Sequence, residues 1–507
     1  MAFLLGIDIG TSGTKTVLFD EEGKTIASST REYPMYQPQI GWAEQRPEDW
    51  WEATSLTIKD VISKTGIDVA SIKGIGLSGQ MHGLVLLDKA GKVLRPSIIW
   101  CDQRTAKECI QITELIGKER LIEITANPAL TGFTASKIMW VKNNEPHIYE
   151  KTAKILLPKD YIRYMLSGVY ATEVSDASGM QLMDIAKREW SPEVLKKLDI
   201  DRALLADLYE SQEVSSMVSR SASDITGLKE GTPIVGGGGD QASGAIGNGI
   251  VKTGVISSTI GTSGVVFAYT DKVTIDPLGR VHTFCHAVPN TWHIMGVTQG
   301  AGLSLKWFRD NFCLSEKEVA TYMNMDPYEL MNSEVEKATP GVEGLIYLPY
   351  LMGERTPHLD PYARGVFFGI SARHTKADML RAVMEGVSYS LKDCMEIIKE
   401  MGVNVSEVRA SGGGGKSNVW RQMQADMFNS EVVTINSGEG PALGVAILAG
   451  VGAGIYNSVA EGCDAVIKKV TSQKPIEANV KVYNSYYPIY KNIYTSLKPQ
   501  FKELSKI

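Results

Sequence analysis

A carboxylate that follows a run of glycines is the first candidate for chemistry in this chain. The segment VGGGGDQASGAIG, residues 235–247, has the pattern of a strand that ends in four glycines, and Asp240 and Gln241 come next, ahead of a helix of small residues. Glycines let a ligand approach the backbone closely. A carboxylate with an ordinary pKa near ~3.9 is a weak base, but phosphoryl transfer through a loose transition state needs the hydroxyl proton removed only late. Asp240 is therefore a candidate catalytic base, and the alternative is that it only caps the next helix.

A repeated turn offers a second candidate, this time for binding. The string IGTSG stands at residues 9–13 and again at residues 260–264, an offset of 260 − 9 = 251 residues. Each copy lies between β-type runs and predicts a hairpin whose N–H and hydroxyl groups could surround an anion. Asp8 precedes the first turn and could face Mg²⁺ directly or through water. Two such turns could hold a polyphosphate between them, unless the glycines serve only the turn geometry.

The repeat also indicates how the elements that carry these residues are organised. Recurrence at mid-length in the same strand context predicts two domains of similar plan. Strands and helices alternate after each hairpin, which is typical of α/β proteins. We place the boundary near residues 240–255, and we expect a C-terminal helix over residues 483–507 that could cross back to pack on the first half.

Two further glycine motifs resemble nucleotide-binding patterns. Gly74, Gly76 and Gly79 have the spacing GxGxxG, but another apolar strand follows them where a dinucleotide site needs a helix. What remains is a strand tip at residues 80–82, which could offer Gln80, Met81 and His82 to a polar ligand, or hold a structural histidine. ASGGGGKS, residues 410–417, nearly matches a P-loop between a strand and a helix, although the glycine run could instead let adenosine lie against the backbone.

Composition excludes several classes of function. The 507 residues carry a net charge of −6, so no overall positive field attracts nucleic acid or anionic lipid. Six scattered cysteines are typical of reduced thiols in the cytoplasm. The longest uncharged run, residues 442–455, is too short to span a bilayer. Residues 280–297 carry histidines and a cysteine that could suggest a metal site, but they alternate like two strands around a Pro-Asn turn.

Taken together, these motifs resemble the FGGY family of carbohydrate kinases over essentially the whole chain. Residues 134–146 resemble the first signature of the family and residues 365–386 the second. The resemblance implies a two-lobed, actin-like (ribonuclease H-like) α/β ATPase fold with the active site in the interdomain cleft. It implies a sugar-binding lobe over residues 1–245 and a nucleotide-binding lobe over residues 246–507. MHG at residues 81–83 resembles members that act on D-xylulose, whereas relatives acting on glycerol place other residues there.

The resemblance also implies roles for single residues. Asp240 is similar to the general base of the family, and Asp8 to the carboxylate near Mg²⁺. The residues that resemble sugar contacts, or that could close the sugar end of the cleft, are Met81, His82, Asp240, Gln241, Trp100, Asp102 and Arg104. The residues that resemble the two phosphate turns are Thr11, Ser12, Gly261 and Thr262. Those that resemble adenosine-lining positions are Gly302, Lys306, Gly413 and Ser417.

The expected function is therefore ATP-dependent phosphorylation of D-xylulose to D-xylulose 5-phosphate by a cytoplasmic enzyme that uses Mg²⁺. Its partners would be a small sugar and neither nucleic acid nor membrane, and relatives that form dimers allow a homodimer here. One alternative keeps the fold and changes the acceptor to another ketose or a polyol, such as ribulose, erythritol or glycerol. Another is a nucleotide-switched actin-like binding protein, because a fold does not fix a function.

Overall fold

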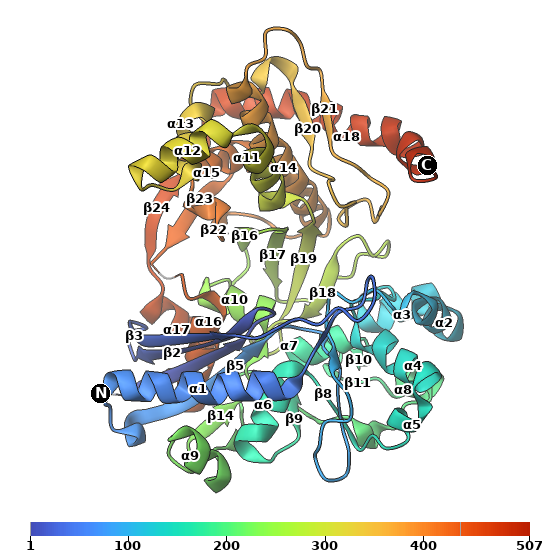
Figure 1. Cartoon of the computed structure of the whole chain (residues 1–507), viewed down its shortest axis with the longest axis vertical. Coiled ribbons are helices and arrows are strands. Elements are labelled where there is room, and N and C mark those ends of the chain that lie inside the picture. The colour runs from blue at the N-terminus through green and yellow to red at the C-terminus, as the bar shows by residue number, and fades with distance from the viewer. Residues whose placement is uncertain (1, 437) are drawn as a thin grey trace.

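The structure is a computed structural model that describes residues 2–436 and 438–507. Two lobes lie one above the other, with the N-terminal half of the chain in the lower lobe and most of the C-terminal half in the upper one (Figure 1). Each lobe is built around a seven-stranded mixed sheet.

The sheet of the first lobe has the strand order β13-β14-β5-β1-β2-β3, with β15 beside β5. β1 pairs antiparallel with β2, whereas β5 is parallel to both β1 and β14. Helix α1 (Pro47–Thr65) packs against β2 and β3. The strands of this sheet are β1 (Phe3–Ile9), β2 (Gly13–Asp20), β3 (Thr25–Glu32), β5 (Ile72–Gly79), β13 (Val214–Met217), β14 (Pro233–Val235) and β15 (Gly238–Gly239).

The sheet of the second lobe repeats this plan in the order β18-β19-β17-β16-β22-β23-β24. β16 pairs antiparallel with β17 and parallel with β22, and β22 is parallel to β23, as in the β1, β2, β5 and β14 set. This duplication confirms the two-lobed actin-like plan. The strands are β16 (Val255–Ile260), β17 (Gly264–Thr270), β18 (His282–Cys285), β19 (Trp292–Thr298), β22 (Glu407–Ser411), β23 (Glu431–Ile435) and β24 (Lys469–Gln473).

Two helices of small residues join the lobes. α10 (Asp240–Gly247) packs along α16 (Gly440–Gly452), and α16 also lies against β1 and β5 of the first sheet. The approach is so close that a Cβ on Gly76 of β5 would lie 2.0 Å from the carbonyl oxygen of Val445. The uncharged run therefore forms a buried helix that comes late in the chain but packs on the first lobe. In the described part of the chain, no helix combines the length and apolar character needed to cross a membrane.

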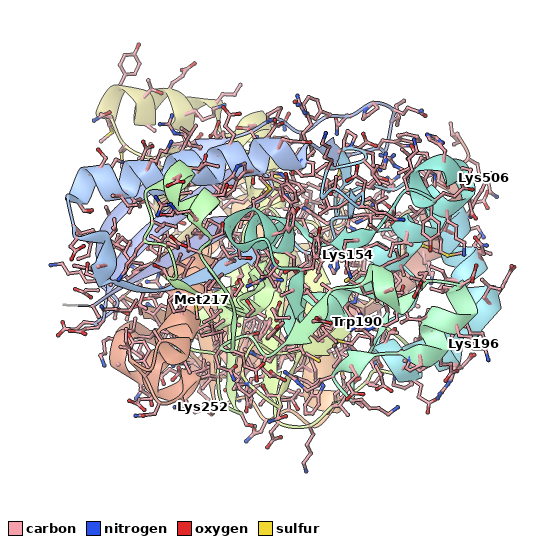
Figure 2. All side chains as sticks on the ribbon, turned by 90° about the horizontal axis from the view of Figure 1, so that it is seen from below. Lys154, Trp190, Lys196, Met217, Lys252 and Lys506 are labelled. Carbon is pink, nitrogen blue, oxygen red and sulfur yellow. The ribbon has the colours of Figure 1, made fainter. Side chains whose placement is uncertain are left out.

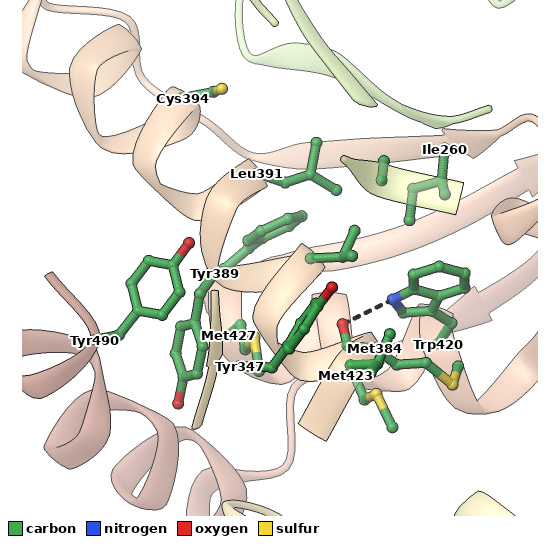
Figure 3. Close-up of a cluster of buried hydrophobic side chains, with 14 of the residues drawn as sticks. Ile260, Tyr347, Met384, Tyr389, Leu391, Cys394, Trp420, Met423, Met427 and Tyr490 are labelled. Atoms are coloured by element: carbon green, nitrogen blue, oxygen red, sulfur yellow. Dashed lines mark hydrogen bonds between the residues drawn. The ribbon is translucent and has the colours of Figure 1, made fainter. Parts of the chain in front are cut away.

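The core of the second lobe surrounds the long helix α14 (Lys376–Glu400). Trp420 on α15 (Asn418–Phe428) donates its indole N–H to the carbonyl of Met384 at 3.1 Å, and Tyr389 and Tyr490 pack against each other on the far side of the same cluster, with ring centroids 5.0 Å apart (Figure 3). The other helices of this lobe are α11 (Ala301–Phe312), α12 (Leu314–Met323) and α13 (Pro327–Val335), and its small hairpin is β20 (Ile346–Leu348) with β21 (Val366–Phe368).

The last helix, α18 (Glu477–Leu504), packs on this core and not on the first half of the chain. The expectation that it crosses back is wrong, and its tyrosines give the physical reason. Tyr483 donates its hydroxyl to Glu385 at 2.8 Å, and Tyr487 donates to Asp393 at 2.6 Å, both on α14. Buried carboxylates on α14 need these donors, so the aromatic face of α18 belongs to the second lobe.

Between β5 and β14 the first lobe adds a helical layer with its own core. Seen from below, Lys154 and Trp190 lie on this layer, with Lys196 farther out on α8 (Figure 2). The layer comprises α2 (Ala106–Ile116), α3 (Lys118–Thr125), α4 (Thr134–Asn144), α5 (Pro146–Tyr149), α6 (Pro158–Ser167), α7 (Val174–Ala177) and α8 (Pro192–Leu198). The β18–β19 hairpin of the second lobe reaches this layer, since Asn127 donates to the carbonyl of Thr283 at 3.0 Å.

Candidate active site

The glycine run brings Asp240 to the end of the first sheet. β15 pairs with β5 at Ser78 and Gly79, and Asp240 begins α10 directly afterwards. Gly237 has φ +70°, and a Cβ there would lie 2.0 Å from the carbonyl oxygen of Leu77. Only glycine fits this turn. Asp8 pairs with the same Ser78 from the other side of β5, so the two carboxylates stand at the ends of strands that flank β5.

The charge of Asp8 raises the cost of ionising Asp240. Burial, followed by the charge of Asp8, raises the pKa of Asp240 to about 7, while hydrogen bonds from Gln241 oppose the rise. Burial also raises the pKa of Asp8, against the lowering effects of Ser78 and Lys15. A carboxylate that titrates near neutral pH accepts a proton more readily than an ordinary aspartate. With this raised pKa, Asp240 is a stronger candidate base than an aspartate with an ordinary pKa would be.

The donors present fit a Mg²⁺ ion beside Asp8. One oxygen of Asp8, Oδ1, is buried without a hydrogen-bond partner, and a cation there would also relieve its repulsion with Asp240. Among the described residues no group of three or more His, Cys, Asp or Glu side chains is placed to hold a metal ion. Any further ligands would have to be water and phosphate oxygens, which Mg²⁺ commonly uses.

The two IGTSG turns are both closed by the N–H of their first glycine, but the acceptor lies three residues on in the first turn and two residues on in the second. The N–H of Gly10 donates to the carbonyl of Gly13 at 3.0 Å, and that of Gly261 donates to Ser263 at 2.9 Å. Ser12, Gly261 and Thr262 are exposed, so their polar groups are accessible to a ligand. The two turns thus stand at matching ends of the two sheets, with donors for phosphate oxygens.

The candidate adenosine residues fall into two groups around the second turn. Gly302, at the start of α11, donates its N–H to the carbonyl of Gly261 at 2.9 Å, so this helix is bonded directly to the phosphate turn. Lys306 points outward and pairs with Asp310 at 2.7 Å. Gly413 lies in the exposed turn after β22, and Ser417 caps α15 and donates to Asn332 at 2.9 Å.

A cavity of about 600 Å³ connects the candidate base with the second glycine run. Asp240 and Gln241 line it at the α10 side, and Gly412, Gly415 and Lys416 line it at the other. The P-loop interpretation of residues 410–417 is wrong, because the strand belongs to the duplicated actin-like sheet and the hydroxyl of Ser417 is used to cap α15.

Met81 and His82 lie at the tip that follows β5, and Met81 reaches the glycine run. The buried Met81 side chain lies against Gly239, the residue before Asp240. His82 has φ +69°, a strained conformation that is typical of functional sites. Its Nδ1 is 2.9 Å from the carbonyl oxygen of Gly179, and burial with the charge of Lys137 lowers its pKa to about 3. His82 is therefore a neutral, oriented imidazole near physiological pH.

The WCDQR segment takes a different role from the one expected. Asp102 is fully buried, and its carboxylate accepts from the backbone N–H of Ala43 at 2.6 Å and from Arg104. Arg104 stacks on the ring of Trp42 at 3.7 Å and pairs with Glu44. With its carboxylate engaged inside the first lobe, Asp102 has none left for a sugar, and this prediction is wrong on geometric grounds.

Trp100 lies nearer to the phosphate turn than to the expected sugar end. Its indole N–H donates to Thr11 Oγ1 at 2.9 Å, and 40% of the side chain is exposed. Thr11 is consequently held in place by a residue from the sugar-binding lobe's own loop. Trp100 thus links the first phosphate turn to the surface of the cleft.

A buried ionic network behind the glycine run was not recognised from the sequence. Arg163 donates to the carbonyls of Val235 and Gly236 at 2.6 Å each, and Ser175 Oγ accepts from the N–H of Gly239 at 3.1 Å. Lys159 lies among carboxylates on α6, β9 (Ala171–Glu173) and α7. A signal was present, since α6 carries Lys159, Asp160 and Arg163 within an otherwise apolar and aromatic stretch.

The comparisons with known proteins agree with this geometry. The N-terminal domain of the FGGY family of carbohydrate kinases matches residues 3–247, and its C-terminal domain matches residues 256–453. A xylulose kinase of Bacillus subtilis (strain 168) is 42% identical over 498 residues, 98% of each chain. A gluconokinase of the same organism is 34% identical over 510 residues, which cover 99% of this chain and 98% of that protein.

A solved structure extends the agreement to the fold. The crystal structure of a ligand-bound xylulose kinase from Lactobacillus acidophilus superposes with a TM-score of 0.92 at 26% identity, and covers 99% of this chain and 100% of that chain. The two domain matches leave residues 1–2, 248–255 and 454–507 outside them. The chain therefore belongs to the FGGY family of carbohydrate kinases.

Proposed function

We propose that this chain transfers the γ-phosphoryl group of ATP to O5 of D-xylulose and releases D-xylulose 5-phosphate and ADP. The observation that carries the proposal is Asp240, whose pKa of about 7 suits a general base and which adjoins the Met81 and His82 tip. The xylulose kinase that is 42% identical along nearly the whole chain supports D-xylulose as the acceptor.

In the proposed reaction, Asp240 orients the acceptor hydroxyl and takes its proton as the new O–P bond forms and the bond to ADP breaks. Mg²⁺ bound beside Asp8 would neutralise charge on the phosphate oxygens. The donors of the two turns, at Thr11, Ser12, Gly261 and Thr262, hold the transferred group and its neighbours. Closure of the lobes excludes water that would otherwise take the phosphoryl group.

The remaining assignments are part of the same proposal. Gln241 contacts the sugar from the helix that Asp240 begins, and Gly302, Gly413 and Ser417 line the adenosine, with Lys306 at the edge. The sugar-binding lobe is residues 1–245 and the nucleotide-binding lobe is residues 246–507, apart from α16, which packs on the first sheet. We place the enzyme in the cytoplasm and allow for a homodimer.

The decisive experiment measures ADP release from MgATP with a panel of acceptors: D-xylulose, D- and L-ribulose, L-xylulose, D-gluconate, glycerol, erythritol and xylitol. We expect D-xylulose to give the highest kcat/KM by at least ten-fold. A different winner would overturn the acceptor but keep the kinase mechanism. If no acceptor stimulates ADP release from a protein that binds ATP, the chain is a nucleotide-switched binding protein instead.

A further inference from the structure

A loop of the second lobe carries an arginine whose position is fixed by its neighbours. The segment between β20 and β21 descends from the top of the second lobe toward the first lobe (Figure 1). Glu354 accepts from Thr298 Oγ1 at 2.6 Å and from the N–H of Gln299 at 2.9 Å. Thr356 donates its N–H to the carbonyl of Val297 at 3.0 Å. Arg355 lies between these two anchored residues, at the end of β19.

A second anchor orients the same stretch toward the β18 strand. Thr356 Oγ1 donates to the carbonyl of Arg280 at 2.8 Å, two residues before His282. The backbone around Arg355 is thus tied to both strands of the β18–β19 hairpin, which is the part of the second lobe that touches the helical layer of the first. These hydrogen bonds fix the residues on both sides of Arg355, so its place in the backbone is set by the fold.

The guanidinium of Arg355 has no hydrogen bond or ion pair with any residue that the structure describes. Its adjacent carboxylate, Glu354, is already engaged by Thr298 and Gln299. Burial lowers the pKa of Arg355, and the charge of Glu354 offsets this only in part. A cation partly withdrawn from water without a bonded partner is costly unless a ligand supplies one.

The loop that carries Arg355 lies close to an aromatic cluster that includes His82, one of the candidate sugar contacts. The hydrogen bond from Thr356 Oγ1 to the carbonyl of Arg280 places the loop beside the strand that carries His282, and the charge of Arg355 is one of the causes that lower the pKa of His82 and His282. The ring of Phe133 lies 4.9 Å from His82 and 5.8 Å from His282, which makes one aromatic cluster from the two lobes. The imidazoles are neutral and cannot serve as counterions. The anchored loop therefore brings Arg355 from the second lobe to the His282 side of this cluster, while His82 belongs to the first lobe.

We infer that Arg355 is a binding residue of the second lobe that donates hydrogen bonds to the terminal oxygen of the acceptor at the end remote from Asp240, which is O1 of D-xylulose. The inference rests on the proposed function. Met81 contacts Gly239, the residue before Asp240, and His82 follows Met81 in the chain, so this strand tip leads away from Asp240 toward His82. The forked donors of arginine suit an oxygen that also contacts a neutral imidazole. The sugar would then touch both lobes and favour their closure.

The test compares Arg355→Met with the unchanged enzyme on D-xylulose and on 1-deoxy-D-xylulose, which lacks O1. We expect kcat/KM for D-xylulose to fall at least about ten-fold through KM, with KM for ATP changed less than about two-fold, because a charged hydrogen bond to the sugar is lost. On 1-deoxy-D-xylulose the substitution should cost less than about three-fold. Equal losses on the two sugars, or an unchanged KM for D-xylulose, would overturn the inference.

A second variant and a control distinguish loss of sugar binding from poor folding and from a general effect of removing an arginine. Arg355→Lys keeps the charge and should recover part of the affinity for D-xylulose, even if Arg355→Met folds poorly. Arg373→Met removes an exposed arginine that pairs with Glu343 at the surface of the same lobe, and should leave all constants unchanged. If the unchanged enzyme does not phosphorylate D-xylulose, the proposed function fails first, and the same comparison is made with the acceptor that the panel identifies and its analogue lacking the remote oxygen.

Discussion

Two groups of carboxylates lie next to the glycine run, one fully buried and one half-buried, and they differ in how their charge is balanced. Behind the run, Asp160, Glu173 and Asp176 surround Lys159, whose Nζ lies 2.7, 3.4 and 3.2 Å from them. In front of it, Asp8 and Asp240 face each other, and neither forms a hydrogen bond or ion pair with a lysine or arginine side chain that the structure describes. The first group therefore holds its cation within the protein, although both oxygens of Asp176 lack a hydrogen-bond partner, whereas the second group has no such ion pair among the described residues.

The difference shows how one turn can be both rigid and reactive. Arg163 and Ser175 hold the backbone of residues 235–239 from behind with groups that are themselves paired or bonded. Asp240 therefore keeps its position although its own charge is not neutralised, and its pKa of about 7 reflects that imbalance. A cation bonded to Asp240 would lower its pKa from this value and make it a poorer base.

The largest expected effect comes from removing the reactive charge. Asp240→Asn keeps the shape of the side chain but cannot accept the proton, so kcat should fall by about 10³-fold or more. The fold should persist, because the substitution removes a repulsion with Asp8 and breaks no ion pair. ADP release with D-xylulose and a thermal melt measure the two quantities. A well-folded variant with near-normal turnover would refute the assignment of Asp240 as the base.

The second prediction concerns Lys159 and the three buried carboxylates around it. Lys159→Met leaves three buried carboxylates without their cation, so the free energy of unfolding should fall by about 3–5 kcal/mol. Urea denaturation followed by tryptophan fluorescence measures it. Lys142→Met is the matched control, since Lys142 pairs with the exposed Asp199 and should cost less than about 1 kcal/mol. Equal losses in the two variants would mean that the buried network does not support the glycine run.

The duplicated fold could be predicted because the same short turn needs the same strand pair on either side. The two IGTSG strings therefore located β1–β2 and β16–β17, and with them the plan of both sheets. The position of α16 could not be predicted in the same way. Its apolar residues are buried on every side, and no polar face shows which lobe it joins. The packing of α18 could not be predicted either, because the partners of its tyrosines on α14 lie about a hundred residues away in the sequence.

In the candidate site, the sequence predicted the position of a residue where the backbone requires glycine next to it. It did not predict the partners of long side chains. Asp240 follows glycines that the backbone needs, so its location could be predicted. Asp102 looked similar in its motif, yet Ala43 and Arg104 occupy its oxygens. Arg355 stands in a loop with no periodic pattern, and only the fold brings it toward His82. Long-range partners of this kind leave no trace in the spacing of residues.

The smallest effect that still separates the two carboxylate groups is the response to pH. With a pKa of about 7, Asp240 is deprotonated above neutral pH, so kcat/KM should fall about ten-fold for each unit below pH 7. Because ATP also titrates in this range, the carboxyl itself is followed by ¹³C NMR without nucleotide, with Asp240→Asn to assign its signal. Asp8→Asn should shift the titration to lower pH, since the charge of Asp8 is one cause of the raised pKa.

The free energy of unfolding should also depend on the ionisation of Asp240, but it should fall as the pH rises, whereas kcat/KM should increase. The folded protein holds a proton on Asp240 up to about pH 7, whereas the unfolded chain releases it near pH 3.8. Folding therefore takes up a proton between these values, and the contribution of Asp240 to stability is full below about pH 4 and is lost as the pH rises through 7. Asp240→Asn should remove this slope, which urea denaturation at several pH values measures. An unchanged slope would mean that Asp240 is ionised in the folded protein over this whole pH range. The protein would then tolerate the charges of Asp8 and Asp240 together without a bound ligand.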